Sequence, residues 1–445
     1  MSNTRSFTIR LLLLCTCYLS LALPGTPAHA GGTFTVNTTT DAGDANPGDA
    51  ICSTAAGNGG CSLRAAVIEA NTLGGVSTIN LPAGVYNLTI PSSAEEQNPS
   101  IGDLDLSGKL TLAGAGAGQT IVEAENSGDR VFQVLDQATV LISGITIRNG
   151  APVPTTLRGG GGIYVGRAQL ALDHVALTHN HASAIYGEMS TLILTDTTII
   201  SNSSDFGAGI YSTNASTLKM TDSSVLDNTA NGPGGGLYNN GNTVTLSGVT
   251  IAGNIAKFGG GGIFNNSTMT AVNMTISGNQ VYAFSSAGGA AGGAIFNDSG
   301  RLISLVNVTI VGNASTDLGG GLYNLDTGTI RLKNTIIANS PSGGNCAGTI
   351  ASDGHNIDSG ESCAFGRSDD RRDIDPLLGP LQNNGGPTRT HALISGSPAI
   401  NAGDNTDCPA TDQRGTARPQ ERICDIGAVE YQEGRYRVYL VRVSR

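Results

Sequence analysis

The sequence predicts an all-β protein, a right-handed parallel β-helix (a solenoid) covered at its N-terminal end by an amphipathic capping helix. A Gly-rich segment, a short alternating apolar segment and a closing Asn recur along the middle of the chain, mostly 22 to 27 residues apart. Within each copy the apolar residues alternate with a period of two, which is typical of strands with one buried face. The 445 residues include 63 Gly and only 13% charged residues, which suits a solenoid of small turns. Each copy is therefore expected to form one coil, and right-handed winding is the default for parallel crossovers.

Two features of the repeat have a structural explanation. An aliphatic–aromatic pair occurs at Ile163-Tyr164, Ile185-Tyr186, Ile210-Tyr211, Leu237-Tyr238, Ile263-Phe264, Ile295-Phe296 and Leu322-Tyr323. The closing Asn occurs at Asn149, Asn180, Asn202, Asn228, Asn254, Asn279, Asn313 and Asn339. Equivalent residues of stacked coils lie above one another, so the pairs predict an aliphatic core and an aromatic stack. A buried Asn at each turn can link its amide to the next coil.

The chain divides into five segments by pattern. Arg5 and Arg10 precede an apolar run, and Ala28-His29-Ala30 is a cleavage-site motif, which predicts a secretory signal peptide over 1–30. A cap region is expected over 31–75, the coils over 76–340, further coils over 341–431 and a tail over 432–445. No transmembrane helix is expected in the mature chain, which would be secreted or held at the cell surface.

The charge limits the partners. Residues 1–30 carry two Arg and no acid, so the mature chain would have 22 basic and 35 acidic residues, a net charge of −13. An acidic rod is a poor partner for nucleic acid. It suits divalent cations, calcium among them, or simply a soluble surface.

Six cysteines follow the signal peptide, as Cys52, Cys61, Cys346, Cys363, Cys408 and Cys424. Six cysteines allow fifteen connectivities. In a rigid rod, proximity in sequence favours Cys52–Cys61, Cys346–Cys363 and Cys408–Cys424. Export favours disulfides, and zinc is the weaker interpretation because no Cys-x-x-Cys spacing occurs.

The segment CSLRAAVIEAN (61–71) is the clear helix, with an apolar stripe and Ser62 as its N-cap. It resembles the N-terminal signature of secreted bacterial proteins named for a CSLREA motif, with Ala65 where the family has Glu. Ser and Glu at this spacing form a capping box, so Ala65→Glu is expected to stabilise the helix.

Two further resemblances concern location. The GGGIFNN and GGAIFND copies resemble the repeats of polymorphic outer-membrane proteins. The ordered motifs GHNID (354–358), DPLLGPLQNNGGPT (375–388), GSPAINAGD (396–404), DQRG (412–415) and CDIGAVE (424–430) are similar to the domain called choice-of-anchor Q. This resemblance implies final coils of the same helix and attachment to the cell envelope. Neither the N-terminal signature nor this C-terminal domain implies an established enzymatic activity.

Candidate metal ligands are sparse. Asp173, Asp196 and Asp222 precede the closing segment of three consecutive copies, so stacking would place their carboxylates about 5 Å apart. Such a row needs a counterion, a proton or full solvation, and the alternatives are a calcium ladder or solvated turn residues. The loop holding Asp41, Asp44, Asn46 and Asp49 suits calcium or Asx turns equally. His174, His179 and His181 suit a metal less well than solvated turns.

Two functions from different classes remain. Many parallel β-helices are polysaccharide lyases or hydrolases that use several exposed carboxylates. Here Asn405-Thr406-Asp407 and Asp369-Asp370 match polygalacturonase-like motifs by letter only, outside the regular coils. The absence of Trp and the packing of Tyr and Phe into a stack leave few rings for sugar stacking. The sequence thus favours a non-enzymatic adhesin, scaffold or envelope component, with surface glycans or the envelope as partners. A pectate-lyase-like lyase or hydrolase is the alternative.

Overall fold

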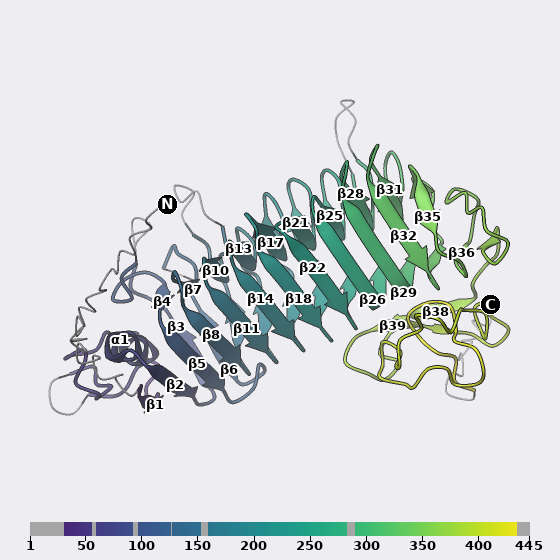
Figure 1. Ribbon diagram of the computed structural model, residues 1–445. Coiled ribbons are helices and arrows are strands. Elements are labelled where there is room, and N and C mark those ends of the chain that lie inside the picture. Colours follow the sequence, from purple (N-terminus) through teal and green to yellow (C-terminus); the bar gives the residue numbers. More distant parts are fainter. Residues whose placement is uncertain are drawn as a thin grey trace, which may run out of the picture.

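The computed structural model describes residues 31–55, 59–91, 97–125, 127–152, 159–282 and 290–433. The expected signal peptide and the tail from 434 onward lie outside the described residues. The described chain forms a stack of β coils along one axis, with the helix α1 (Leu63–Leu73) at its N-terminal end (Figure 1). In this part of the chain no helix is long and apolar enough to cross a membrane.

Three parallel sheets form the walls of the stack. The ten-stranded sheet consists of β4 (Leu104–Leu106), β7 (Phe132–Val134), β10 (Ile163–Gly166), β13 (Ile185–Glu188), β17 (Ile210–Thr213), β21 (Leu237–Asn240), β25 (Ile263–Asn265), β28 (Ile295–Asn297), β31 (Leu322–Asn324) and β34 (Cys346–Ala347). The five-stranded sheet consists of β16 (Ser203–Ser204), β20 (Thr229–Ala230), β24 (Ile255–Ala256), β27 (Gln280–Val281) and β30 (Ala314–Ser315).

The third wall, called the long sheet, takes one long strand or two shorter ones from each coil. It consists of β1 (Thr33–Thr35), β2 (Val76–Leu81), β3 (Gly84–Asn87), β5 (Lys109–Gly114), β6 (Thr120–Glu123), β8 (Thr139–Ser143), β9 (Thr146–Arg148), β11 (Gln169–Asp173), β12 (Ala176–Thr178), β14 (Thr191–Thr195), β15 (Thr198–Ile200), β18 (Thr217–Thr221), β19 (Ser224–Leu226), β22 (Thr243–Ser247), β23 (Thr250–Ala252), β26 (Thr268–Ser277), β29 (Leu302–Val311), β32 (Thr329–Lys333), β33 (Ile336–Ala338), β35 (Ile350–Ser352), β36 (Ile357–Asp358) and β37 (Arg371–Arg372). The fold class predicted from the repeat is therefore confirmed.

The predicted Asn ladder is confirmed over six consecutive coils. The Oδ1 atom of Asn228 accepts from the backbone N–H and the Nδ2 of Asn202, both at 2.9 Å. The Nδ2 of Asn228 donates to the carbonyl of Ile199, 3.1 Å away in the preceding coil. The ladder members are Asn180, Asn202, Asn228, Asn254, Asn279 and Asn313, all fully buried.

The two terminal members predicted for this ladder are wrong by one residue. The pairing of β9 with β12 aligns Gly150, not Asn149, with Asn180, and Gly150 donates its N–H to the Asn180 Oδ1. The pairing of β29 with β33 likewise aligns Ser340, not Asn339, with Asn313. Asn149 and Asn339 instead adopt positive φ at the turn, a conformation that Asn tolerates well.

A second Asn ladder was not predicted. It lies on the inner face of the ten-stranded sheet, where each Nδ2 donates to the Oδ1 of the next residue at 2.7 to 2.8 Å. Its members are Asn239, Asn265, Asn297 and Asn324. The first Asn of the GGGIFNN copies was the available signal, because it recurs at one offset from the aromatic residue.

The capping helix begins as predicted, and Ser62 Oγ accepts from the N–H of Ala65 at 3.0 Å. Ala65 is 0% exposed, so the expectation that glutamate would stabilise this position is corrected. The neighbouring Arg64 is also buried and pairs with Asp41 at 2.6 Å. Arg64 donates further to the carbonyls of Pro99 and Gly102, each at 2.8 Å. This side chain therefore ties the N-terminal loop, the helix and the first coils together.

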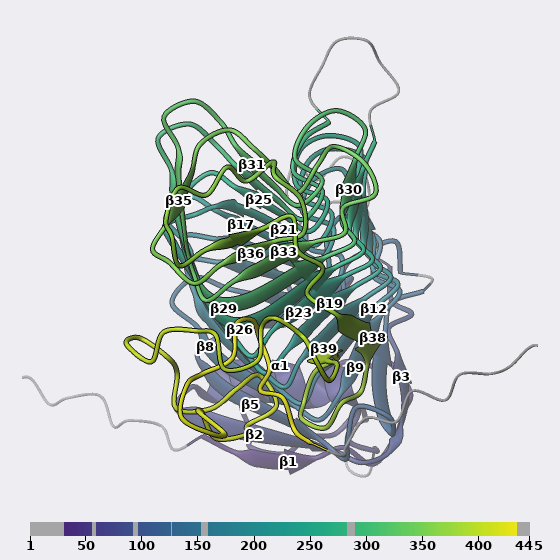
Figure 2. The ribbon, with the colours of Figure 1, turned by 90° about the vertical axis from the view of Figure 1, so that its right-hand side faces the viewer.

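The C-terminal region departs from the expectation that coils continue over 341–431. Regular coil strands end with β37, which pairs with β36. Residues 373–433, here called the C-terminal module, fold back against the long sheet instead (Figures 1 and 2). Within the module, β38 (Leu378–Gln382) and β39 (Thr390–Leu393) form an antiparallel hairpin.

The side chains of the long sheet explain this docking. Val311, Ile336 and Ala338 form an apolar cluster with Leu393 and Ile426 of the module. Nearby, polar groups on the outer face of the sheet bond the module, as in Thr275 to Gln413 at 2.7 Å and Asn307 to the carbonyl of Asp425 at 3.1 Å. The three predicted disulfides are present: Cys52–Cys61, Cys346–Cys363 and Cys408–Cys424.

We expect Arg64→Ala to lower the free energy of unfolding by about 3–5 kcal/mol, because it leaves the Asp41 charge buried without its partner. Arg331→Ala is the matched control, since the Arg331–Asp353 pair is largely exposed and such pairs contribute about 0–1 kcal/mol. Urea denaturation measures both, and equal losses would contradict the role given to Arg64.

We expect Ala65→Glu to lower the urea midpoint, because the helix already has its Ser62 cap and the new carboxylate would be enclosed in the core. The control is Ser62→Ala, which should cost about 1 kcal/mol by removing the cap. A raised midpoint for Ala65→Glu would mean that the side chain reaches the N-cap after all.

Candidate functional site

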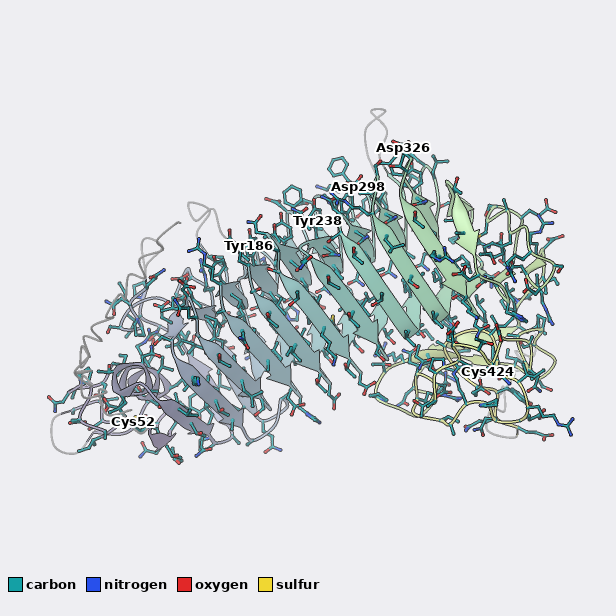
Figure 3. The ribbon with its side chains drawn as sticks, in the orientation of Figure 1. Cys52, Tyr186, Tyr238, Asp298, Asp326 and Cys424 are labelled. Carbon is teal, nitrogen blue, oxygen red and sulfur yellow. A yellow bond between two sulfur atoms is a disulfide. The ribbon has the colours of Figure 1, made fainter. Side chains whose placement is uncertain are left out.

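The aromatic stack predicted from the repeat lies on the outer face of the ten-stranded sheet. Because successive side chains of a strand point to opposite faces, Ile163, Ile185 and their equivalents lie in the core and the neighbouring rings point outward. The rings, here called the aromatic strip, are Tyr164, Tyr186, Tyr211, Tyr238, Phe264, Phe296 and Tyr323. Neighbouring ring centroids are 4.8 to 5.7 Å apart. All but the buried Tyr164 are partly exposed, and Figure 3 shows Tyr186 and Tyr238 along one edge of the rod.

A row of polar side chains runs beside the aromatic strip, two residues further along each strand. This polar row consists of Glu188, Thr213, Asn240, Asn266 and Asp298. Asn266 Nδ2 donates to Asn240 Oδ1 at 2.8 Å, and Asn240 Nδ2 donates to Thr213 Oγ1 at 3.4 Å. Burial, then the charges of Tyr211 and Asp298, raises the pKa of the Tyr238 phenol. The sequence analysis missed this row, although its repeat offset is fixed.

A hollow of about 110 Å³ lies at the N-terminal end of the aromatic strip. Its polar lining consists of Gln97, Gln133, Asp136, Tyr164, Arg167 and Glu188. Arg167 occupies a tight turn of positive φ between β10 and β11, and Asp136 and Glu188 lie on the two adjacent coils. The hollow thus collects one guanidinium, two carboxylates, a phenol and two amides.

The floor of the hollow is fixed by buried charge. Arg130 lies 5.2 Å from the centre of the Tyr164 ring and donates to Gln133 Oε1 at 2.5 Å. Its charge is balanced by Asp103 at 3.4 Å and Asp129 at 4.0 Å. On the open side, the Tyr164 hydroxyl donates to Glu188 Oε2 at 2.9 Å, and Asn214 donates to Oε1 at 3.0 Å. Ring, amide and carboxylate are therefore held in place without a ligand.

The predicted row of three stacked carboxylates is wrong at its first member. Asp173 pairs with Thr195, so His174, and not Asp173, aligns with Asp196 and Asp222. These three residues share positive φ at the same turn. His174 bridges Asp173 at 2.8 Å and Asp196 at 2.9 Å, and these carboxylates raise its pKa. Burial, then the charge of Asp196, raises the pKa of Asp222.

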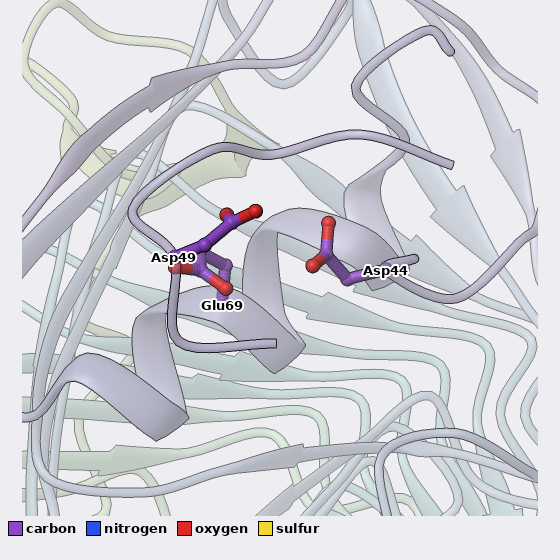
Figure 4. A group of neighbouring side chains, drawn as sticks. All are labelled: Asp44, Asp49 and Glu69. Carbon is purple, nitrogen blue, oxygen red and sulfur yellow. The ribbon is translucent and has the colours of Figure 1, made fainter. Parts of the chain in front are cut away.

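Among the described residues, one group of acidic or metal-binding side chains has its ligand atoms within 4.8 Å of one another: Asp44, Asp49 and Glu69 (Figure 4). It unites part of the predicted calcium loop with the capping helix. The buried Glu69 accepts from the N–H groups of Gly48 and Ala50 at 2.6 and 2.5 Å. Asp44 accepts from Ser53 and Asn46. These hydrogen bonds order the loop, which explains why the three carboxylates lie together.

The other candidate residues, the histidines and the acids of the polygalacturonase-like motifs, form local contacts. His179 pairs with Thr178, and His181 pairs with Ser203 of the next coil. Asp369 binds Arg367, which holds the pKa of the Asp369 carboxyl below its usual value. Asp407 binds Lys333 at 3.0 Å. The letter matches to polygalacturonase motifs therefore fall in ion-paired loops, away from the hollow.

A family model described as a right-handed β-helix region matches residues 114–291. The chain is a right-handed parallel β-helix protein. Pectate lyase Pel9A aligns with a TM-score of 0.50 at 15% identity, over 91% of this chain and 98% of that one. The similarity shows a shared β-helix fold.

Two other solved structures align with lower scores. The A-module of the Azotobacter vinelandii mannuronan C-5 epimerase AlgE6 has a TM-score of 0.29 at 15% identity, over 65% of this chain and 93% of its own. The catalytic domain of an alpha-1,3-glucanase in complex with tetrasaccharides has a TM-score of 0.30 at 14% identity, over 72% and 68%. No curated protein matches this β-helix protein in sequence.

The motifs DQRG and CDIGAVE of this β-helix protein build a buried charge network in the C-terminal module. Arg414 binds Asp412 at 2.6 Å and Arg418 binds Glu430 at 2.7 Å, all four side chains being buried. Asp425 accepts from the N–H groups of Asn401 and Tyr431. Burial and the charge of Glu430 raise the pKa of the Asp425 carboxyl to about 6. These motifs therefore hold the module together, which is a structural role.

The raised pKa of Asp425 predicts a pH-dependent effect of Asp425→Asn. The unfolded chain releases this proton near its usual value and the folded chain near pH 6, so ionisation destabilises the wild type as pH rises between them. Asparagine cannot ionise but loses one acceptor for the two N–H groups. We expect the variant to melt below the wild type at pH 4, and to recover by about 2–3 kcal/mol relative to it by pH 7. A melting difference independent of pH would contradict this assignment.

Proposed function

We propose that this protein is a secreted or surface-held glycan-binding rod whose ten-stranded sheet presents the binding surface. The observation that carries the proposal is the pairing, coil after coil, of a partly exposed ring with a hydrogen-bonding side chain two residues away. Sugar rings offer apolar C–H surface together with hydroxyl groups that both donate and accept. Aromatic residues with polar partners complement both properties.

The orientation of the rings limits how they contact a sugar. Tyr238, Phe264 and Phe296 are nearly parallel, with interplanar angles of 4° and 10°, so their faces cover one another and their edges face outward. Phe206 differs, because it is 47% exposed and contacts Tyr211 and Tyr238 at centroid distances of 6.4 and 6.1 Å. We infer that Phe206 supplies the stacking face and that the strip supplies edges and hydroxyl groups.

Export and attachment complete the proposal. Three disulfides support an oxidising compartment, in agreement with the signal peptide expected over 1–30. The resemblance of 341–431 to choice-of-anchor Q supports attachment to the cell envelope. The rod would then hold glycans at the cell surface as an adhesin or envelope component.

A second candidate, a glycan-cleaving enzyme, is favoured by one observation: Asp136 and Glu188 line the same hollow. Glycoside hydrolysis uses two carboxylates as acid and base, or as acid and nucleophile. Release of reducing or unsaturated ends from a polysaccharide, abolished by Glu188→Gln even at saturating polysaccharide, would establish the enzyme.

We expect Phe206→Ala to weaken polysaccharide binding at least about tenfold, the loss of roughly 1.4 kcal/mol of contact. Affinity electrophoresis in gels containing soluble polysaccharides measures the retardation. Ile193→Ala is the control, since Ile193 is an exposed apolar residue on the long sheet. Absence of retardation for the wild type in every gel would refute the proposed function.

A further inference from the structure

We propose that the hollow at the N-terminal end of the aromatic strip is a subsite for one uncharged sugar residue, and that the rod therefore selects neutral polysaccharides over polyuronates. This inference rests on the proposed glycan-binding function. It assigns a ligand chemistry to one place, where Asp136, Arg167 and Glu188 of three successive coils line the same hollow.

The hollow is built to exchange hydrogen bonds with hydroxyl groups. Glu188 accepts one bond at each oxygen, from Asn214 and from Tyr164, and each carboxylate oxygen can accept a second. Arg167 is an exposed donor on the preceding coil. A sugar hydroxyl donates and accepts at once, so it can bridge a carboxylate and a guanidinium as no simple ion can.

The rigidity of the floor favours a specific subsite. Gln133 and Tyr164 are each 2% exposed, and Arg130 holds both through its guanidinium. Because Asp103 and Asp129 surround Arg130, its charge is compensated within the floor. Polar groups that are already positioned lose little entropy when the ligand arrives.

The balance of charge decides the class of sugar. The groups that line the hollow are two carboxylates, Asp136 and Glu188, against one guanidinium, Arg167. A uronate would bring a third carboxylate next to the first two, and like charges at contact distance are unfavourable. The polar row continues with the neutral side chains of Thr213, Asn240 and Asn266 and ends with Asp298, and the whole chain carries a net charge of −11. An acidic polymer is therefore repelled both locally and at long range.

The size of the hollow limits it to one residue of the polymer. Its volume of about 110 Å³ is well below the roughly 300 Å³ at which pockets for drug-sized ligands begin. Tyr164 and Glu188 belong both to the hollow and to the outer face of the sheet, so a chain seated here continues over Tyr186 and Tyr211.

Isothermal titration calorimetry on the full mature chain tests the subsite. The probes are cellohexaose, maltohexaose and laminarihexaose as neutral ligands, with hexagalacturonate and a chitosan hexamer as charged ones. We expect at least one neutral hexamer to bind with an affinity that does not change between low and high salt, and more tightly than hexagalacturonate. Glu188→Gln and Arg167→Ala should each weaken it about tenfold. Glu361→Gln and Arg331→Ala, exposed residues elsewhere on the rod, should not.

Each contrary result has one meaning. Tighter binding of hexagalacturonate, weakened by salt, would overturn the selection of neutral sugars, and preference for the chitosan hexamer would overturn it in favour of a cationic ligand. Neutral binding lost in Phe206→Ala but unchanged in both hollow variants would refute the subsite and leave the proposed function standing. No binding of any probe, together with no retardation in polysaccharide gels, would refute both. Melting temperatures of the variants exclude loss of fold as the cause.

Discussion

A buried amide that bridges one coil to the next is the interaction on which this structure depends. At each ladder position after Asn180 one Oδ1 atom receives two hydrogen bonds from the preceding coil, and the Nδ2 returns one to a carbonyl there, as at Asn228. A bend in a β coil leaves backbone groups without sheet partners, and burial makes such groups costly. The ladder satisfies them and fixes the register, because a slip of one residue would break every amide bond at once. All other regularities of the rod follow from that fixed register.

One consequence is that the surface repeats as faithfully as the core. Side chains at one offset form a continuous row, so an outward ring becomes a strip and an outward amide becomes a polar row. The hollow shows the complementary effect. Where the pattern drifts, at Gln133 in line with Tyr164, the rows stop being uniform and different chemical groups converge. A repeating face with one irregular end suits a polymer, because the repeat offers the same contacts to successive sugar residues and the irregular end offers one specific subsite.

The ends of the rod depend on buried charge more than on repetition. Arg64 links loop, helix and coil at one end. At the other, the pairs Arg414–Asp412 and Arg418–Glu430 hold together a module with few regular strands. Single charged groups with several partners impose one geometry on irregular backbone, since a missing partner leaves a buried charge uncompensated. The charged residues of the motifs CSLRAAVIEAN, DQRG and CDIGAVE therefore have a structural role: they fix the irregular backbone at the two ends of the rod.

The sequence by itself determined the coil, the aromatic stack, the capping helix, the three disulfides and the central six members of the Asn ladder. Each of these follows from a local period or from spacing, which a single chain displays directly. The sequence did not determine the register of the strands. Asn149, Asn339 and Asp173 have the residue type expected for their rows, yet each lies one residue out of line. The C-terminal module was mistaken for coils, because its docking depends on which outer residues of β29 and β33 are apolar. The hollow joins side chains of three coils at irregular spacing, so only the stacking of the coils, set by tertiary contacts, brings them together.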